Sequence, residues 1–374
     1  MRFIVEGKSL QQQLQAVSKV INSKNTLSIL DNFLLRMDGD KLYITGSDQE
    51  NTMTACLEVS DSEGTGEVAV SAKRLLEIVK EIAGQPLTFD VNDDNKEIEV
   101  SFLNGRFSFM GVDAAQYPRK VSSAEELISM DIPSSVIKKG IDSTIFAVSP
   151  EAVRPIMTGI YWDIHMGDIT FVSSDTHKLV RYIDSRVQPG MECSFIMPSK
   201  PANILRSLLS GNEDDMVHLE FDSKGATFTF GNYTLSNLFI KGNYPNYNRV
   251  IPEKNPFVVE VDRVSLLTAL RRVAIFAAKS SNLVVIELGD TGMVLSTQDL
   301  DYATAATEKV TCSYEGNPMT IGFNCQFMIE VLNNLDCDTI LLKLSDPARP
   351  GIYTPLEQKE NEDIVVIQMP MQVL

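Results

Sequence analysis

The chain has 374 residues, with 33 Lys and Arg against 50 Asp and Glu, and its formal net charge of −17 argues against general affinity for nucleic acid unless basic residues are gathered on one face. The length allows two or three domains. No apolar stretch is as long as a membrane span, and Glu6 and Lys8 interrupt the apolar run that a signal peptide would need, so we expect a cytoplasmic protein.

The first third of the chain alternates short apolar strands with two amphipathic helices. Apolar residues spaced three and four apart predict the helices, and Gly39-Asp40 between β-rich runs predicts a hairpin. The predicted elements are, in order, a strand at 3–5, a helix at 10–21, a hairpin at 33–37 and 42–45, a strand at 68–70, a helix at 75–82, and a hairpin at 97–100 and 107–109.

The rest of the chain repeats this order twice. Asp262 is a predicted N-cap, and Pro201 suits a first helical turn. The predicted elements are a strand at 130–132, a helix at 136–145, a hairpin at 160–162 and 169–172, a strand at 195–197 and a helix at 204–209, then a strand at 258–261, a helix at 266–274, a hairpin at 284–286 and 294–295, a strand at 321–323 and a helix at 327–335.

Two markers recur about 125 residues apart. Tyr117-Pro118 returns as Tyr244-Pro245 and Met369-Pro370, and Gly46-Ser47-Asp48 returns as Ser173-Ser174-Asp175 and Thr297-Gln298-Asp299. A repeat this long can hold its own core. We therefore predict an α+β protein of three similar tandem domains, each built from two βαβββ halves. The predicted domains are 1–125, 126–253 and 254–374, with linkers near 122–126 and 251–255.

Positive charge is concentrated on the predicted helices, away from their apolar stripes. Five of the six carry Lys or Arg on or just after them, while the helix at 327–335 has none. The basic residues are Lys8, Lys19, Lys24, Lys73, Arg74, Lys80, Lys138, Lys139, Lys200, Arg206, Arg271, Arg272 and Lys279. One such helix would be an ordinary solvated face. Five in an acidic chain favour a shared positive surface that contacts phosphates without reading sequence.

The sequence offers little for catalysis or metal binding. Five dispersed cysteines form no Cys-x-x-Cys pair, and only three histidines are present, so we expect no metal and no cofactor. Ser174, Asp175 and His177 could be read as a nucleophilic set, but residues this close in an extended loop rarely converge as a triad, and no glycine-rich oxyanion turn accompanies them. We therefore expect a protein that is not an enzyme, with no catalytic residues.

Several motifs resemble the β subunit of bacterial DNA polymerase III, the sliding clamp, over the whole chain. They are Thr26-Leu27-Ser28-Ile29-Leu30, Thr45-Gly46-Ser47-Asp48, Ser174-Asp175-Thr176-His177-Lys178-Leu179, Asn243-Tyr244-Pro245-Asn246-Tyr247-Asn248-Arg249-Val250, Ile321-Gly322-Phe323-Asn324 and Met369-Pro370-Met371. The family's terminal motif usually continues with Arg-Leu, where this chain has Gln372-Val373-Leu374.

The resemblance implies a clamp fold with helices inside and sheets outside, and a processivity factor that encircles duplex DNA as a head-to-tail homodimeric ring. It implies as partners the replicative polymerase and repair proteins that carry a short Gln, Leu and Phe motif. Because the chain has no ATP-binding motif, ring opening should need a separate clamp loader. We expect no membrane partner.

The resemblance also implies three sets of site residues. The peptide pocket would comprise Met157, Ser174, Thr176, His177, Lys178, Leu179, Pro245, Arg249, Val250, Asn324, Phe327, Pro350, Ile367, Met369 and Met371. The dimer interface would place Arg106, Phe107 and Phe109 against Ile275, Phe276, Asp299 and Asp301. Weak DNA contacts would be spread over Lys24, Lys73, Lys200, Arg206, Arg271 and Lys279.

Two alternatives remain open at this point. A scaffold ring that does not act on DNA would share the fold without depending on the basic helices, and a hydrolase would require His177 for turnover. For each apolar pocket residue taken alone, ordinary core packing is also a sufficient explanation.

Overall fold

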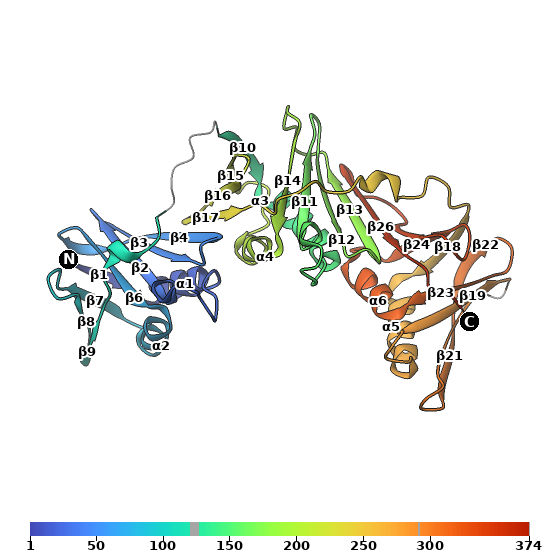
Figure 1. Cartoon of the computed structure of the whole chain (residues 1–374), viewed down its shortest axis with the longest axis horizontal. Helices are drawn as coiled ribbons and strands as arrows, with labels where there is room; N and C mark the ends of the chain where they lie inside the picture. The colour runs from blue at the N-terminus through green and yellow to red at the C-terminus, as the bar shows by residue number, and fades with distance from the viewer. Residues whose placement is uncertain (120–126, 291, 374) are drawn as a thin grey trace. The chain divides into compact units, whose positions relative to one another are not determined.

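The computed structural model describes residues 1–119, 127–290 and 292–373. The chain forms two compact units: Met1–Ser135 with Asn203–Phe239, and Val136–Ala202 with Ile240–Leu374. Strands and helices alternate along the chain in both (Figure 1). The second repeat is therefore divided between the two units.

Six α-helices occur in the described residues, and each follows a strand. They are α1 (Gly7–Ser18), α2 (Ala72–Ile82), α3 (Ser134–Thr144), α4 (Ser199–Leu208), α5 (Arg263–Val273) and α6 (Cys325–Asn334). The predicted N-cap is confirmed, because the Asp262 carboxylate accepts a 2.7 Å hydrogen bond from the Ser265 amide. Pro201 lies in the first turn of α4, as predicted.

Five of the six described helices end one to three residues earlier than the apolar stripes predicted, and 3₁₀ turns follow two of them. The chain tightens into the 3₁₀ turns η3 (Ile145–Ala147) and η6 (Ala274–Phe276), and then becomes extended at Val148 and Ala277. Lys279 consequently lies beyond α5 rather than on it. Lys24 likewise follows α1, whose C-cap is Lys19. The apolar stripes run past the helix ends in the sequence because some residues just after the helices, such as Val20 and Ala147, are also buried.

Two sheets lie in the amino-terminal unit. The first has the order β5 (Ser60–Glu63), β1 (Arg2–Glu6), β7 (Pro86–Val91), β8 (Glu97–Phe102) and β9 (Gly105–Met110). The second has the order β10 (Ile128–Pro133), β15 (Met216–Phe221), β16 (Gly225–Phe230), β17 (Tyr233–Leu238), β4 (Asn51–Glu58), β3 (Lys41–Ser47), β2 (Asn32–Asp38) and β6 (Gly66–Ser71).

Two further sheets lie in the other unit. One has the order β14 (Cys193–Pro198), β11 (Gly159–Ile164), β12 (Ile169–Ser174), β13 (Lys178–Asp184), β26 (Glu362–Gln368), β25 (Gly351–Pro355), β24 (Thr339–Leu344), β18 (Phe257–Asp262) and β22 (Cys312–Glu315). The other has the order β21 (Thr304–Val310), β20 (Gly292–Asp299), β19 (Leu283–Gly289) and β23 (Met319–Asn324).

The element order confirms the predicted fold class. Every half-repeat is a strand, a helix and three strands, with β5 and β22 added after the first halves of repeats one and three. The predicted domain boundaries remain a prediction, and the linker expected near 122–126 lies outside the described residues. Residues 251–255 carry no helix or strand, in keeping with the second predicted linker.

Antiparallel strand pairing joins neighbouring repeats inside each unit. In the first unit β17 pairs with β4, with Asn237 opposite Asn51. In the second unit β26 pairs with β13, with Gln368 opposite Lys178. Two repeats therefore share one continuous sheet at each joint.

The cores lie between sheets and helices. In the second unit the apolar stripes of α5 and α6 pack on its sheets, with Leu266, Leu270 and Val331 fully buried. Gly140 lets α3 approach its sheet, because a Cβ there would lie 2.4 Å from the Phe171 ring. Among the described residues, no helix is long and apolar enough to span a membrane.

Candidate functional site

The joint between β13 and β26 positions an apolar surface. Leu179 on β13 lies opposite Ile367 on β26, and both pack with Val172, Tyr247 and Ile352. Along each strand, alternate side chains face the same side of the sheet, so these residues form a common floor. Tyr247 comes from the 3₁₀ turn η5 (Tyr247–Arg249), and the next residue, Val250, is half exposed.

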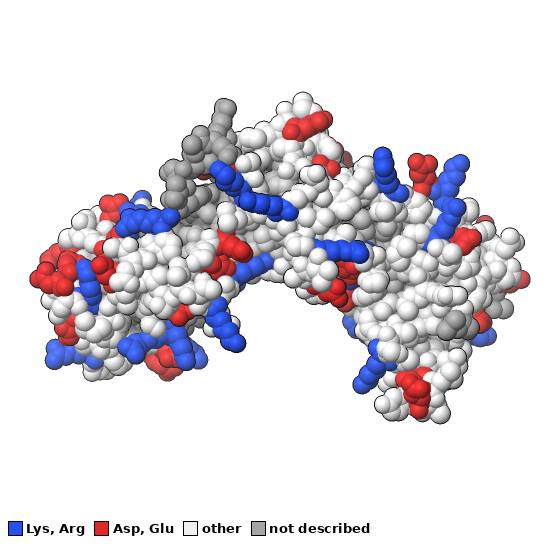
Figure 2. All heavy atoms as spheres, in the orientation of Figure 1, with Lys and Arg blue, Asp and Glu red and all other residues white. Residues whose placement is uncertain are grey.

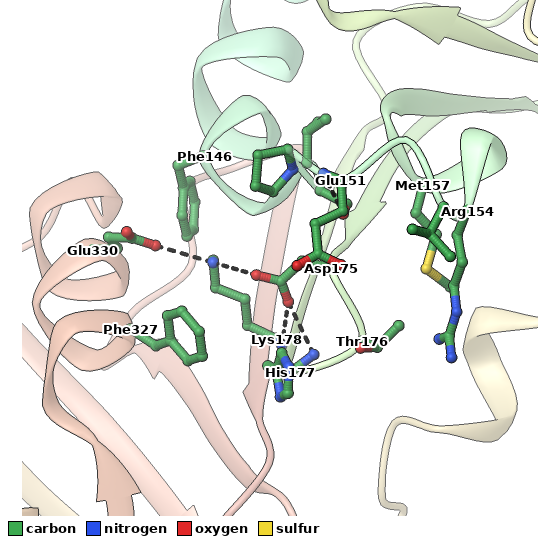
Figure 3. A pocket seen from close by; sticks show the side chains of 14 residues that line it. Phe146, Glu151, Arg154, Met157, Asp175, Thr176, His177, Lys178, Phe327 and Glu330 are labelled. Atoms are coloured by element: carbon green, nitrogen blue, oxygen red, sulfur yellow. Dashed lines mark hydrogen bonds and ion pairs between the residues drawn. The ribbon is translucent and has the colours of Figure 1, made fainter. Parts of the chain in front are cut away.

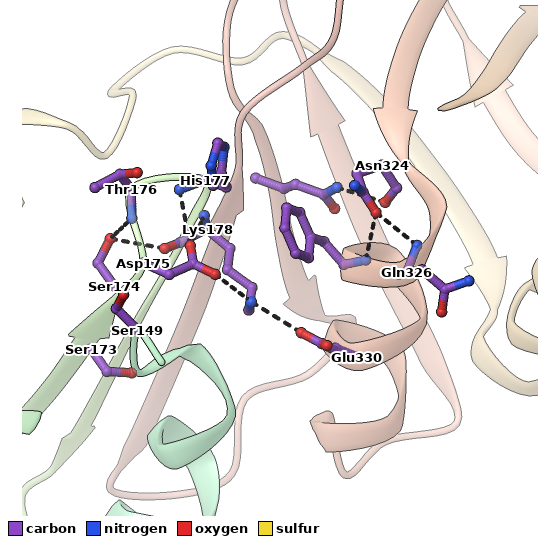
Figure 4. Close-up of polar contacts among 12 residues, drawn as sticks. Ser149, Ser173, Ser174, Asp175, Thr176, His177, Lys178, Asn324, Gln326 and Glu330 are labelled. Atoms are coloured by element: carbon purple, nitrogen blue, oxygen red, sulfur yellow. Dashed lines mark hydrogen bonds and ion pairs between the residues drawn. The ribbon is translucent and has the colours of Figure 1, made fainter. Parts of the chain in front are cut away.

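The turn between β12 and β13 is held by its own side chains. The Asp175 carboxylate accepts hydrogen bonds of 2.9 Å from the amides of His177 and Lys178. The Ser174 hydroxyl donates to the Lys178 carbonyl at 2.9 Å and accepts from the Thr176 amide (Figure 4). These bonds hold Thr176 at a φ of +79°, a conformation that few non-glycine residues adopt.

Lys178 joins this turn to α6. Its ammonium lies 2.6 Å from Asp175 Oδ2 and 3.0 Å from Glu330 Oε2, and 4.4 Å from the centre of the Phe327 ring. The Lys178 side chain is 4% exposed, whereas that of Glu330 is 46% exposed. The buried charge is therefore paired on both sides, as burial of an ammonium requires.

His177 and Phe327 face each other above the floor. Their rings are stacked with centres 5.6 Å apart. The His177 carbonyl accepts a 2.8 Å hydrogen bond from the Met369 amide, which ties the turn to the end of β26. Asn324 caps α6 by accepting from the amides of Gln326 and Phe327 (Figure 4). The cap and the stacking fix the position of Phe327.

Tyrosines support the floor on one side. The rings of Tyr161 and Tyr244 are stacked with centres 4.7 Å apart, and the Tyr247 hydroxyl donates to Asp163 at 2.8 Å. Burial raises the pKa of all three phenols, for Tyr247 with the help of the nearby Asp163 carboxylate. These phenols therefore remain neutral at physiological pH.

The structure brings together most of the residues expected in the pocket. Leu179 and Ile367 lie in the floor, and Val250 directly follows the floor turn η5. Met157, Thr176, His177, Lys178 and Phe327 line a cavity of about 560 Å³. Ser174, Asn324 and Met369 are linked to these residues by the hydrogen bonds above. Arg249 ends the floor turn, Pro245 lies two residues before that turn, and Pro350 precedes the floor strand β25. The Met371 amide donates to the Gly322 carbonyl. Their role in binding remains a prediction.

Nine residues that line this cavity were not expected from the sequence: Phe146, Val148, Ser149, Pro150, Glu151, Val153, Arg154, Asp175 and Glu330. Asp175 could have been found, since it ends the repeated marker. Glu330 could not, because it reaches Lys178 from a helix about 150 residues further along the chain. Its contact depends on how two repeats pack.

The hydrogen bonds of the Ser174, Asp175 and His177 segment do not form a catalytic triad. Ser174 donates to a backbone carbonyl, Asp175 holds two amides and Lys178, and His177 stacks on Phe327. A triad would require a Ser–His–Asp chain of hydrogen bonds. In the part of the chain that the structure describes, no three His, Cys, Asp or Glu side chains are placed to bind a metal ion.

The predicted DNA contacts lie on helices and the turns that follow them in each unit. Lys24, Lys73 and Arg206 are exposed in the first unit. In the second, Arg271 donates to Asn333 at 2.8 Å, Lys279 is exposed, and Lys200 is half-buried. Figure 2 shows Lys and Arg side chains near α2, with acidic residues among them. Their contact with DNA remains a prediction.

The residues expected at a dimer interface lie by two open sheet edges. Arg106 and Phe107 are exposed on edge strand β9, whereas Phe109 is buried. Ile275 and Phe276 are exposed in the turn η6, and the Asp299 carboxylate accepts from the Asp301 amide. Further apolar residues near these edges are exposed and were not predicted from the sequence: Leu103, Met110, Leu300 and Tyr302. The turn between Asp299 and β21 is longer than the matching turns of the first two repeats, and this difference in the sequence could have pointed to Leu300 and Tyr302.

Three family models match the chain in order. The N-terminal domain of the DNA polymerase III beta subunit matches residues 1–121, the central domain matches 131–246, and the C-terminal domain matches 248–372. The chain belongs to the beta sliding clamp family. It has the role of that family, which is a non-catalytic processivity subunit of DNA polymerase III.

Relatives and solved structures agree with this assignment. The beta sliding clamps of Proteus mirabilis and Pseudomonas aeruginosa are 28% and 26% identical, over the full length of both chains in each case. Crystal structures of the Pseudomonas aeruginosa clamp with a ligand and bound to griselimycin each align with a TM-score of 0.93 at 25% identity, again over both full chains. The sequence-based identification of the family is thus confirmed.

Proposed function

We propose that two copies of the chain close head to tail into a ring around duplex DNA, and that the β13–β26 joint captures a short segment of each partner protein. The observation that supports the ring is a pair of open sheet edges. β9 is the edge strand of one sheet and β21 is the edge strand of another. Within their repeats, β9 corresponds to β17 and β26, and β21 corresponds to β4 and β13, which are the strands that pair at the internal joints.

The internal joints supply the register of the proposed interface. Asn237 and Gln368 each lie three residues before a residue, Ile240 or Met371, whose amide bonds to the first strand of the same half-repeat. Val112 makes the same kind of bond to Ala69, so Phe109 is the matching residue on β9. Repeating the joint between chains therefore requires an antiparallel strand on β9.

The other side of the joint is matched in the same way. Asn51 and Lys178 lie opposite the aspartates of the repeated marker, Asp48 and Asp175. Thr304 lies opposite Asp299 and is the matching residue on β21. The proposed register thus sets Phe109 opposite Thr304 of the partner subunit, and Phe107 opposite Ala306 of the partner subunit. A large ring would then pack over a small residue.

Side chains at the two edges suit burial between copies. Phe107 packs on Phe102 with ring centres 5.0 Å apart, and Leu103 is 85% exposed at the tip of the same hairpin. Across the proposed interface, Ile275 is 77% exposed and Phe276 is half exposed. Apolar residues this exposed beside an unpaired strand mark an association site. Head-to-tail contacts close into a ring when the rotation per subunit allows.

The helices are numerous enough to surround DNA. With the six described helices in each, two chains would supply about twelve, and at spacings of about 10 Å their axes would lie on a circle about 38 Å across. Subtracting one helix diameter of about 10 Å leaves an opening of about 28 Å. The groove depths of B-DNA imply a duplex about 20 Å wide. A ring holds DNA by topology, so weak and salt-dependent contacts from the basic helices are sufficient.

The β13–β26 joint fits a peptide with a few apolar anchors. Leu179 and Ile367 offer an apolar floor, while the His177 ring offers a polar group at its edge, next to Met369. Methionine at such a rim adapts to different partners. A segment with Gln followed by Leu and Phe, carried by the polymerase and by repair proteins, would bind with roughly micromolar affinity because ordering a flexible peptide offsets part of the gain.

Retention on circular DNA tests the ring directly. After loading onto a nicked plasmid by a clamp loader, we expect the protein to stay bound through gel filtration at about 0.5 M salt, where contacts to phosphates are weakened. Cutting the plasmid once should release the protein, since only free ends let a ring slide off. Equal retention on circular and linear DNA would contradict the proposal.

A further inference from the structure

The cavity beside His177 continues past the proposed peptide pocket toward α6. It shares Met157, Thr176, His177, Lys178 and Phe327 with that pocket. It extends beyond them between Phe146 and Glu330 (Figure 3). Its volume of about 560 Å³ is several times that of a single side chain, and is within the range of ligand-binding clefts. A segment seated on the apolar floor would therefore have a second space next to it.

Negative charge dominates the inner part of this cavity. Glu151, Asp175 and Glu330 approach it from three different elements around the single ammonium of Lys178 (Figure 3). Asp175 is committed to Lys178 and to two amides. Glu330 is half exposed, and it pairs with Lys178 through its Oε2. A half-exposed carboxylate can accept a further cation.

The cavity is also lined by an arginine, Arg154, which lies apart from these carboxylates. Arg154 points away from the three carboxylates, on the far side of Thr176 and Met157 (Figure 3). It therefore does not neutralise Glu151 or Glu330. The walls near these carboxylates are apolar and aromatic, with Phe146 and Phe327 both lining the cavity. Aromatic faces and carboxylates together favour a cation on an apolar stem.

We propose that this cavity takes one Lys or Arg side chain from the same partner segment that occupies the apolar floor. The inference rests on the proposed peptide-binding function. The incoming cation would pair with Glu330 and Glu151 and lie against Phe146, while Lys178 keeps its bond to the buried Asp175. Partners with a basic residue next to the Gln-Leu-Phe motif would be preferred over partners with an acidic residue there.

The test compares labelled peptides by fluorescence anisotropy on the full-length protein. Each peptide carries the core Gln-Leu-Ser-Leu-Phe, with Lys placed at one of the three positions before the Gln. Matched peptides carry norleucine, which has a similar apolar stem without charge, or Glu. We expect Lys in one of these positions to bind about three- to tenfold tighter than norleucine, and Glu to bind more weakly than either.

Charge-removing variants locate the effect. In the variant Glu151→Gln with Glu330→Gln, the Lys preference should fall to nearly onefold while the norleucine peptide keeps its affinity. The new amide on α6 would still offer an oxygen to Lys178, so the turn should be preserved. The control variant, Glu357→Gln with Glu360→Gln, changes the net charge equally in the exposed β25–β26 loop and should keep the preference.

The outcomes separate the two proposals. Equal affinity of the wild type for Lys, norleucine and Glu peptides at all three positions would overturn the cation site and leave the peptide pocket intact. A Lys preference that survives the Glu151 and Glu330 changes would also overturn it. If no core peptide binds the wild type at all, the peptide pocket itself fails, and the cation site fails with it.

Discussion

At the scale of single residues, Lys178 matters most to the site. Its ammonium is buried between Asp175 and Glu330, and the same residue sits opposite Gln368 at the repeat joint. Replacing it by Met keeps the stem but leaves Asp175, a buried carboxylate, without its counter-ion. We expect Lys178→Met to lower the free energy of unfolding of this unit by about 2–3 kcal/mol, because an unpaired buried charge is costly.

The single tryptophan makes this measurable. Trp162 is fully buried in the same unit, so its fluorescence during urea unfolding reports on that unit. Lys359→Met is the matched control, since Lys359 pairs with Asp336 at 2.7 Å but is mostly exposed. The control should change stability by less than about 1 kcal/mol. Equal losses in the two variants would contradict a special role for Lys178.

At the scale of elements, α5 and α6 begin with caps of different chemistry. Asp262 caps α5 with a carboxylate, and hydrogen bonds from Ser265 lower the pKa of that carboxyl. Asn324 caps α6 with an amide that does not titrate. Removing either cap by substitution with Ala should cost about 1 kcal/mol at neutral pH, as measured by urea unfolding followed through Trp162.

The two variants should differ with pH. Because the folded pKa of Asp262 is lowered, its stabilisation is complete above the ordinary carboxyl pKa and is lost as the pH falls through the folded value. The stability difference between wild type and Asp262→Ala should therefore shrink between about pH 6 and about pH 3. The difference for Asn324→Ala should stay constant over that range. A parallel decline in both would show that cap ionisation is not the cause.

At the scale of the whole molecule, the two open sheet edges should decide assembly. The chain has a mass of 41.5 kDa, and we expect sedimentation to give twice that value for the wild type. Replacing Ile275 by Ala and Phe276 by Asp puts a charge into the proposed apolar contact and should give folded monomers. Met166→Asp, which places the same charge at an exposed apolar residue in the β11–β12 turn, should remain dimeric. A dimeric double variant at low concentration would contradict the interface.

Sequence by itself determined the local elements and their repetition. The spacing of Leu266, Leu270 and Val273 predicts α5 without reference to any partner, and Asp262 marks its start. Such signals are short-range, because helix periodicity and capping depend on residues within a few positions of each other. The repeated markers extended this local reading to three copies and to the family. Local periodicity extended the predicted helix too far at Ile145, because the chain there changes to a 3₁₀ turn whose last residue, Ala147, is still buried.

Only the tertiary structure decided how the repeats join and what the joint presents. The pairing of Leu179 with Ile367 links strands nearly 190 residues apart, and the contact of Lys178 with Glu330 depends on where α6 settles against the turn after β12. Neither spacing nor residue type in one repeat specifies these contacts, because strand edges and helix faces of all three repeats are alike in pattern. The cavity beside His177 exists because packing left three carboxylates and two aromatic rings around one ammonium.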